Sequence, residues 1–393
     1  MSAFDTISAS EVGRRFRLAR DNAGLTQQEA TDEIGIARTT LVAIEKGSRR
    51  IRMDEARQLA KLYGVSVNAL FRQEAVHIDL VPRFHKLLDA DDKAAGDAVK
   101  IISRFAKAEV ELENLLGIKR IKNFPAERRI LPGDVNQQAE TDALEFRSYL
   151  GLGNAPITDI IKLLEMELGV RVYVRPVDSR ISGLFAHDEA LGSCMLLNAN
   201  HSRVHRTQVA AHECGHFVST RSEPEVLHAD EDISSREERY ADAFGRAFLT
   251  PARAVKQKFQ EVTSGSDKLL RQHVVVLADY FGVSCESMVH RLEGFQLIRA
   301  GSWDWFQSNG GITDQYVKQV LGNPSITDKQ KEDAERTMPL RLSMLAAKAY
   351  QQELLTEEQL SELLDMDRIE LRGILDDLEV EESEADAPFI RSG

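Results

Sequence analysis

The stretch His212-Glu213-Cys214-Gly215-His216 decides the fold of the central part of this chain. It spells H-E-x-x-H, with two histidines four residues apart. On a helix such residues lie on one face, so both imidazoles can reach a single metal ion. Glu213 lies beside them, where its carboxylate can take a proton from water. The motif therefore predicts a helix over residues 206–219 that carries two zinc ligands and a general base.

A second predicted helix, residues 235–249, supplies the remaining groups. Catalytic zinc takes a third protein ligand and keeps one position open, and Glu238 is placed to be that ligand. Asp242 follows one helical turn later, where we expect it to accept a hydrogen bond from a ligand imidazole and fix its tautomer. Hydrolysis at such a site also needs a donor for the developing oxyanion. Three residues are candidates that the sequence does not rank: Tyr240, His205 and His228.

The composition is that of a globular protein, with 42% hydrophobic and 29% charged residues. No apolar run reaches the roughly 20 residues of a membrane helix, and the start, MSAFDTISAS, lacks the features of a signal peptide. The cysteines Cys194, Cys214 and Cys285 are scattered and odd in number, which indicates a reducing compartment rather than disulfides. We therefore expect a cytoplasmic protein that does not bind membranes.

The net charge of −13 hides an asymmetry between the two ends of the chain. Residues 1–75 carry 12 basic and 10 acidic side chains, whereas residues 351–393 carry 3 basic and 14 acidic ones. A mildly basic N-terminal unit on an acidic body suits a DNA-binding head. The acidic residues 380–393 are expected to form a disordered tail.

Residues 9–73 have the pattern of a compact bundle of short helices. Thr26 is predicted to cap the second helix, with Glu29 completing a capping box. A tight turn at Gly35 leads to a third helix that ends near Gly47. Helix, short turn and helix is the layout in which the second helix of the motif enters the DNA major groove.

This segment resembles the XRE family of Cro/C1-type repressors. The shared residues are Gly24-Leu25-Thr26-Gln27, Gly35-Ile36 and Ile44-Glu45-Lys46-Gly47. The resemblance implies a homodimer on paired half-sites of a double-stranded DNA operator. A helical module that binds protein, or that no longer binds DNA, is the alternative interpretation of the same pattern.

The resemblance also implies roles for individual residues. Gln27 would anchor on phosphate. Base edges would be read by Arg38, Thr39 and Ala43, and the backbone contacted by Lys46, Arg49 and Arg50. In this family the arginine that ends the first helix pairs with the glutamate that ends the third. Here those residues are Arg20 and Glu45, to which we assign a structural role.

The middle of the chain is predicted to begin with a helical spacer and linker, residues 76–138, including one long amphipathic helix over residues 92–117. The pattern then becomes α+β, with helices at 143–150 and 157–168 and strands at 169–174, 181–185 and 193–198. If the last of these strands is a sheet edge, a substrate could pair with it as an added strand. Residues 300–379 are predicted to form a small helical C-terminal unit.

Residues 140–297 resemble the ImmA/IrrE family of bacterial metallopeptidases. The matching segments are Ile181-Ser182-Gly183, Leu196-Leu197-Asn198, and residues 211–217 and 238–251. The resemblance implies a gluzincin-type peptidase domain, with His212, His216 and Glu238 on Zn²⁺ and Glu213 as general base. Position 214, usually a large apolar residue in the family, is cysteine here.

These observations predict a mostly α-helical protein with a small β-sheet in its peptidase domain. They indicate a DNA-binding transcription regulator fused to a zinc-dependent endopeptidase, which can rest latent until triggered. In the family, such peptidases cleave XRE-type repressors, so we expect a repressor, in trans or the chain itself, as substrate, and control of stress, mobile-element or defence genes. One alternative is a ligand-sensing repressor with a silent peptidase-like domain. Another is an autoregulated toxin or antiphage peptidase.

Overall fold

A computed structural model describes residues 9–65, 67–71, 92–189, 191–228, 235–266, 268–322 and 338–378. They divide into two units, and the division falls within one long helix. Unit 1 holds the described residues up to Phe71, then 104–120, then 340–378, and unit 2 holds the others. The predicted tail, residues 380–393, lies outside the described residues. No helix among the described residues is long and apolar enough to span a membrane.

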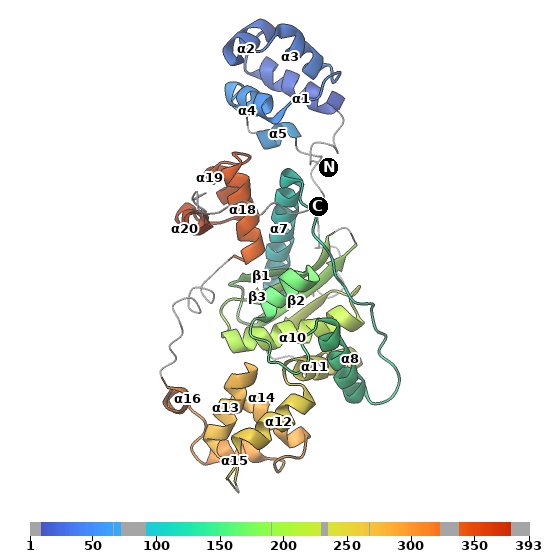
Figure 1. Ribbon diagram of the computed structural model, residues 1–393, viewed down its shortest axis with the longest axis vertical. Coiled ribbons are helices and arrows are strands. Elements are labelled where there is room, and N and C mark those ends of the chain that lie inside the picture. Colours follow the sequence, from blue (N-terminus) through green and yellow to red (C-terminus); the bar gives the residue numbers. More distant parts are fainter. Residues whose placement is uncertain are drawn as a thin grey trace. The chain divides into compact units, whose positions relative to one another are not determined.

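Five helices form the N-terminal part of unit 1 (Figure 1): α1 (Ala9–Asn22), α2 (Gln27–Ile34), α3 (Arg38–Glu45), α4 (Met53–Leu62) and α5 (Val67–Phe71). The predicted capping box at the start of α2 is confirmed, because Thr26 and Glu29 exchange side-chain and backbone hydrogen bonds. Gly35 ends α2 with φ of 70°, a left-handed conformation that glycine adopts without steric cost. This turn changes the direction of the chain between α2 and α3, so that the two helices form the expected helix-turn-helix.

The predicted ion pair between the ends of α1 and α3 is confirmed. Arg20 Nε donates to Glu45 Oε1 at 2.7 Å, Nη2 donates to Oε2 at 3.2 Å, and both side chains are buried. The hydrogen bond to Glu45 raises the pKa of the Arg20 guanidinium despite its burial. Gln27 Nε2 donates to the same carboxylate at 2.7 Å, so Glu45 ties three helices together.

We expect Arg20→Met to destabilise this bundle by about 3 kcal/mol, because the substitution leaves the Glu45 carboxylate buried without its cation. Amide hydrogen exchange in α1 and α3 should accelerate by about two orders of magnitude. Arg17→Met is the matched control, since the Arg17 side chain is 68% exposed. Equal exchange rates in the two variants would contradict a stabilising role for the pair.

The remainder of unit 1 is the second half of α7 (Lys93–Leu116) together with α18 (Leu340–Gln351), α19 (Glu357–Leu364) and α20 (Arg368–Leu378). The long helix predicted over residues 92–117 is therefore confirmed as α7. Its buried Glu113 accepts a hydrogen bond from Arg341 Nη2 at 3.1 Å, and one from Arg120 Nε at 3.2 Å. These charged contacts join α18 to α7.

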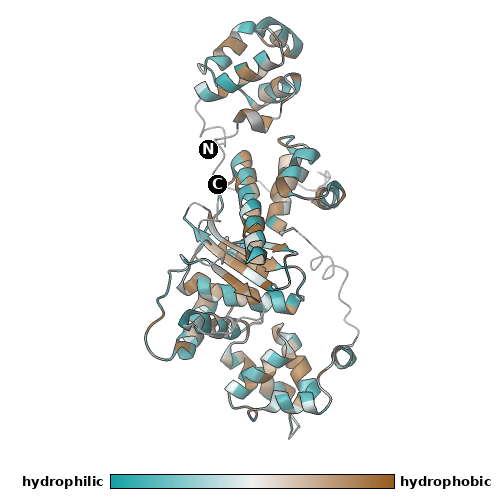
Figure 2. Cartoon of the chain, turned by 180° about the vertical axis from the view of Figure 1, so that it is seen from behind, coloured by the Kyte–Doolittle hydropathy of each residue, from teal (hydrophilic) through white to brown (hydrophobic). Residues whose placement is uncertain are grey.

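Unit 2 contains a four-stranded sheet in the order β1-β3-β2-β4 (Figure 1), formed by β1 (Arg171–Arg175), β2 (Ile181–Asp188), β3 (Gly192–Asn198) and β4 (Glu225–His228). β1 runs parallel to β3, and the other pairs are antiparallel. Figure 2 shows the strands mostly in hydrophobic colours. The expectation that residues 193–198 could offer a free edge is wrong, because β3 lies between two strands and is buried along its whole length.

Helices cover this sheet and extend beyond it: α8 (Val135–Tyr149), α9 (Ile160–Leu163) with a π-helical turn (Leu164–Leu168), α10 (Arg203–Ser219), α11 (Arg236–Leu249), α12 (Ala252–Val262), α13 (Arg271–Phe281), α14 (Cys285–Gly294), α15 (Ser302–Ser308) and α16 (Asp314–Leu321). α10 packs on β2 and β3, α11 packs on α10, and α8 packs on α11. The predicted fold class is confirmed: the protein is mostly helical, with a small mixed sheet and an all-helical N-terminal bundle.

Candidate metal centre

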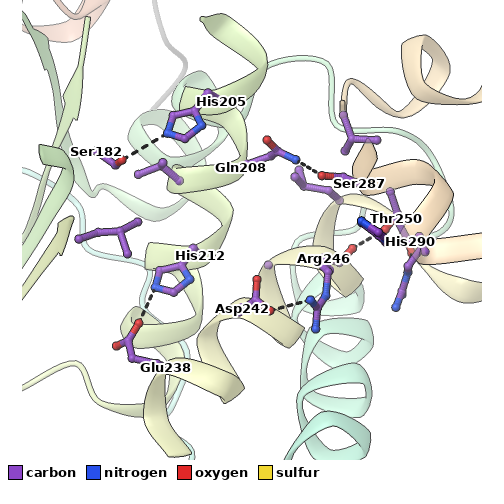
Figure 3. A pocket seen from close by; sticks show the side chains of 16 residues that line it. Ser182, His205, Gln208, His212, Glu238, Asp242, Arg246, Thr250, Ser287 and His290 are labelled. Atoms are coloured by element: carbon purple, nitrogen blue, oxygen red, sulfur yellow. Dashed lines mark hydrogen bonds and ion pairs between the residues drawn. The ribbon is translucent and has the colours of Figure 1, made fainter. Parts of the chain in front are cut away.

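Three side chains converge where α10 crosses α11. His212 Nε2 and His216 Nε2 lie 3.2 Å apart. Glu238 approaches them with both oxygens, Oε2 at 3.3 Å from His212 Nε2 and Oε1 at 3.2 Å from His216 Nε2. Figure 3 shows the His212 ring facing the Glu238 carboxylate. These residues form a group that could hold a metal ion, with ligand atoms within 4.8 Å of one another.

Local sequence places these residues at the right points of their helices. Ser202 caps α10, and Ser235 caps α11 by accepting a hydrogen bond from the Glu238 N–H at 3.0 Å. Glu238 therefore lies in the first turn of α11, where the helix dipole favours a carboxylate. The histidines lie in the buried second half of α10 and approach Glu238 from the other side of the crossing.

Two glycines let the helices cross at close range. A Cβ on Gly215 of α10 would lie 2.5 Å from Ala241 Cα, and one on Gly245 of α11 would lie 2.8 Å from His212 N. Real Cβ atoms do not approach so closely, so both positions require glycine at this separation. The glycines thereby set the distance between the two histidines and the glutamate.

The electrostatics suit a divalent cation of the zinc type. Burial alone would raise the pKa of the Glu238 carboxyl, but hydrogen bonds from His212 and His216 outweigh it and hold that pKa well below its usual range. Glu238 therefore offers an ionised carboxylate beside two imidazole nitrogens. Two histidines and one carboxylate are a ligand set that zinc uses in catalytic sites.

Glu213 follows His212 on α10 and is completely buried. It lies near Gly183 of β2, where a Cβ would come within 3.5 Å of Glu213 Oε1. The pairing of β2 with β4 shifts register between Ile181 and Gly183, which is a bulge beside the site. Such irregularities redirect side chains next to functional sites, and here Ser182 lines the adjoining cavity.

A cavity of about 350 Å³ opens beside His212 and Glu238 (Figure 3). Its apolar wall comes from three elements and one turn, and consists of Val209 of α10, Leu227 of β4, Leu249 of α11 and Val283 between α13 and α14. Gln208 of α10 donates to Ser287 Oγ of α14 at 2.5 Å across one end of the cavity. The volume and the mixed lining are those of a site for a small molecule or a few residues of peptide.

Residues 165–293 match the family model described as the IrrE N-terminal-like domain, in the M78 peptidase family. This segment is therefore an IrrE N-terminal-like domain. The positions of His212, His216, Glu238 and Glu213, and of every residue that lines the cavity, fall within this match.

The bundle in front of the IrrE N-terminal-like domain has its own matches. Residues 16–70 match a helix-turn-helix family model. A segment of 66 residues is 35% identical to the cryptic phage CTXphi transcriptional repressor RstR from Vibrio cholerae. The segment covers 17% of this chain and 57% of that repressor, so the chain spans little more than half of the relative's length. The chain therefore combines a helix-turn-helix domain with an IrrE N-terminal-like domain.

The hydrogen-bond partners of the ligands differ in part from those expected. The Asp242 carboxylate, expected to orient an imidazole, accepts a hydrogen bond from Arg246 at 2.7 Å and lines the cavity. Thr220 Oγ1, which the sequence did not single out, lies 3.2 Å from His216 Nδ1. Thr220 follows His216 by one helical turn, and that spacing was the available signal. The Thr220 hydroxyl thus orients the His216 ring through its Nδ1.

Among the oxyanion candidates whose side chains are described, His205 lines the cavity of the IrrE N-terminal-like domain. Its Nε2 lies 3.3 Å from Ser182 Oγ, and burial, with His201 nearby, lowers its pKa. Tyr240 is fully buried and donates to Asp142 Oδ2 at 2.9 Å, a placement that does not favour an oxyanion role. His228 ends β4, and its side chain lies outside the described residues.

We expect the thiols of this domain to be nearly inert. None of the three cysteines forms a disulfide, Cys194 and Cys214 are buried, and burial raises the pKa of Cys285 to about 11 and that of Cys214 further. At pH 8 iodoacetamide should therefore leave Cys194 and Cys214 intact and modify Cys285 slowly, because the thiolate is the reactive form. Peptide mass spectrometry before and after unfolding measures this; rapid alkylation of native Cys214 would contradict the buried assignment.

The residues expected to contact DNA lie on or beside α3. Four of them are exposed: Arg38, Thr39, Lys46 and Arg50. Ala43 is half-buried, and Gln27, expected at a phosphate, donates to Glu45. Arg49 pairs with Glu55 at 2.9 Å. Three of the four exposed side chains, those of Arg38, Lys46 and Arg50, are cationic.

Proposed function

We propose that this protein is a transcription regulator in which a DNA-binding head is joined to a zinc-dependent endopeptidase that cleaves a repressor-type protein, in trans or itself. The observation that carries the proposal is the convergence of His212, His216 and Glu238 at the wall of a cavity, with Glu213 on the same helix as the histidines. The family match of residues 165–293 supports the peptidase class.

The proposed chemistry assigns a task to each group. His212, His216 and Glu238 would hold zinc, which when bound would supply a Lewis acid for the peptide carbonyl and for water. Glu213 takes the proton of the attacking water and delivers it to the leaving amine. His205, at the cavity wall with a lowered pKa, donates a hydrogen bond to the carbonyl oxygen as negative charge develops. Thr220 holds the ring of His216 in its ligand orientation.

The substrate is proposed to bind as an extended segment along β4. Within the sheet of the described residues, β4 is the terminal strand and has β2 as its one neighbour. Its Leu227 lines the cavity, so a segment added to the outer edge of β4 would place a side chain there. A flexible loop or an unfolded segment of a repressor satisfies this geometry more readily than a folded surface.

The head is proposed to bind an operator as a homodimer, with Arg38, Thr39 and Ala43 at base edges and Gln27, Lys46, Arg49 and Arg50 at the backbone. The exposed cationic side chains of Arg38 in α3 and of Lys46 and Arg50 after it support this proposal, as does the similarity of this segment to a phage transcriptional repressor. The regulated genes are proposed to serve stress responses, mobile elements or defence.

The test is metal content together with proteolysis by the full chain. The purified protein, with zinc quantified, is incubated with XRE-type repressors encoded beside its gene, with and without operator DNA, and the products are read by mass spectrometry. One zinc per chain and cleavage that a chelator abolishes are the expected results. Zinc binding with no cleavage under any condition would replace the proposal with a ligand-sensing repressor.

A further inference from the structure

Helices α18–α20 repeat the N-terminal helix-turn-helix at a constant sequence offset. α2 and α19 are both eight residues long, and each begins with a capping box, Thr26 with Glu29 and Thr356 with Gln359. Each ends at a residue in the left-handed conformation, Gly35 in one case and Asp365 in the other. The repeat therefore includes the start of the helix and the turn that follows it.

The packing of the two copies also corresponds. In the first, Val12 and Ala19 of α1 and Leu41 of α3 are buried, and at the same offset Leu342, Ala349 and Leu371 are buried. α20 packs on α18 as α3 packs on α1. The backbone of the turn matches too, since Ile36 N donates to Thr31 O and Met366 N donates to Ser361 O. The chain thus contains a second helix-turn-helix of the same design.

The surface chemistry of the second copy is inverted. The neutral pair Gln27 and Gln28 becomes Glu357 and Glu358. Glu357 pairs with Arg372 and Glu358 with Arg368, both at 2.7 Å, so the two arginines of α20 are neutralised by α19.

The positions beyond these pairs add acidic and apolar character. Lys46, which follows α3, corresponds to Asp376, and Asp377 comes next. Thr39, a position expected to read a base, corresponds to Ile369, which is 84% exposed. Residues 340–378 carry nine acidic and four basic side chains, a balance that repels phosphate. An acidic face with a projecting isoleucine suits a basic protein surface better than a nucleic acid.

We propose that α19 and α20 form a docking surface for the DNA-reading face of the N-terminal helix-turn-helix of the same chain, in competition with DNA. Charge complementarity selects this occupant, because Arg38, Lys46 and Arg50 are exposed on a face that also suits an anionic partner. Tethering in one chain gives the two surfaces a high effective concentration. The inference rests on the proposed assignment of α3 as the reading helix.

The first test detects the contact without using DNA affinity. A carbodiimide cross-linker of zero length joins an amine to a carboxylate only where the two touch. In the full chain we expect Lys46 to be cross-linked to a carboxylate of α19 or α20, residues 357–378, in a product of monomer mass that excess duplex DNA suppresses. Lys256 of α12, an exposed amine in unit 2, is the internal control. Absence of the Lys46 link, or its presence only in dimers, would overturn the proposal for the same chain.

The second test measures competition. Asp376→Asn/Asp377→Asn in the full chain should bind a mixed-sequence duplex of about 30 base pairs about tenfold more tightly at low salt, because the competing surface is weakened. Asp279→Asn/Asp304→Asn, at exposed positions of unit 2, changes the net charge equally and should have little effect. Weaker binding by the first variant would make the second copy a DNA reader, and equal binding by both would also overturn the proposal. If the N-terminal domain does not bind DNA at all, the Lys46 cross-link still decides whether the two surfaces meet.

Discussion

Glu213→Gln is expected to slow peptide cleavage by about a thousandfold while leaving the metal in place. The amide keeps the shape of the carboxylate in its buried position but cannot accept the proton of the attacking water. The proposed ligands His212, His216 and Glu238 are untouched, so zinc content should stay at the wild-type level. The turnover rate on whichever repressor the wild-type protein cleaves is the quantity to measure, alongside zinc by atomic emission.

The control for this variant is Glu286→Gln on α14, a carboxylate that is 58% exposed and lies in the same domain. It should keep both zinc and turnover. If Glu213→Gln retained full activity with zinc bound, the general base would have to be another residue. Loss of zinc together with activity would instead mean that Glu213 is needed to keep the metal site in its binding conformation.

Gly245→Ala is expected to produce the second large effect, a loss of about 3 kcal/mol in the stability of the domain. The new Cβ would meet His212 N at 2.8 Å and Ala211 C at 2.9 Å, and these are backbone atoms that cannot rotate away. α11 must then move off α10, which carries Glu238 away from the histidines. Zinc affinity, measured by competition with a chelator, should fall by between about 10- and 100-fold.

Gly294→Ala provides a matched control in the same domain. It is also a helical glycine, at the end of α14, but a Cβ there meets no atom within 4 Å. That variant should be neutral or slightly stabilised, since alanine restricts the unfolded chain. Equal zinc affinity in the two variants would show that the close crossing does not set the ligand geometry.

The parts of the fold that follow from local chemistry were predictable from the sequence. The capping box at Thr26 and the turn at Gly35 depend on residues within a few positions of each other. The grouping of His212 and His216 follows from helical periodicity, and the addition of Glu238 followed from its spacing and from the family resemblance. The pair of Arg20 with Glu45 was expected from family resemblance, and periodicity could not have found it.

The parts that depend on competition between neighbours were not predictable. Asp242 follows Glu238 by one helical turn, a spacing from which it was expected to reach a histidine ring. Its carboxylate instead forms an ion pair with Arg246, one turn further along the same helix. Tyr240 lies two residues after Glu238 in sequence. On a helix this spacing places the two side chains on different faces, and Tyr240 points into the core toward Asp142. β4 is only four residues long and is extended because its backbone pairs with β2. That pairing joins segments far apart in the sequence, so the local sequence pattern does not predict it.

The crossing of α10 and α11 has a consequence for the lifetime of the protein. Because the ligand atoms come from two helices, an ion can bind them only when the helices are docked, so mass action links metal concentration to the folding equilibrium. At a free zinc level about a thousand times the dissociation constant, this linkage adds about 4 kcal/mol to the free energy of unfolding. Under the proposed function, a cell short of zinc would hold less of the folded protein, and the abundance of this protein would follow the supply of the metal.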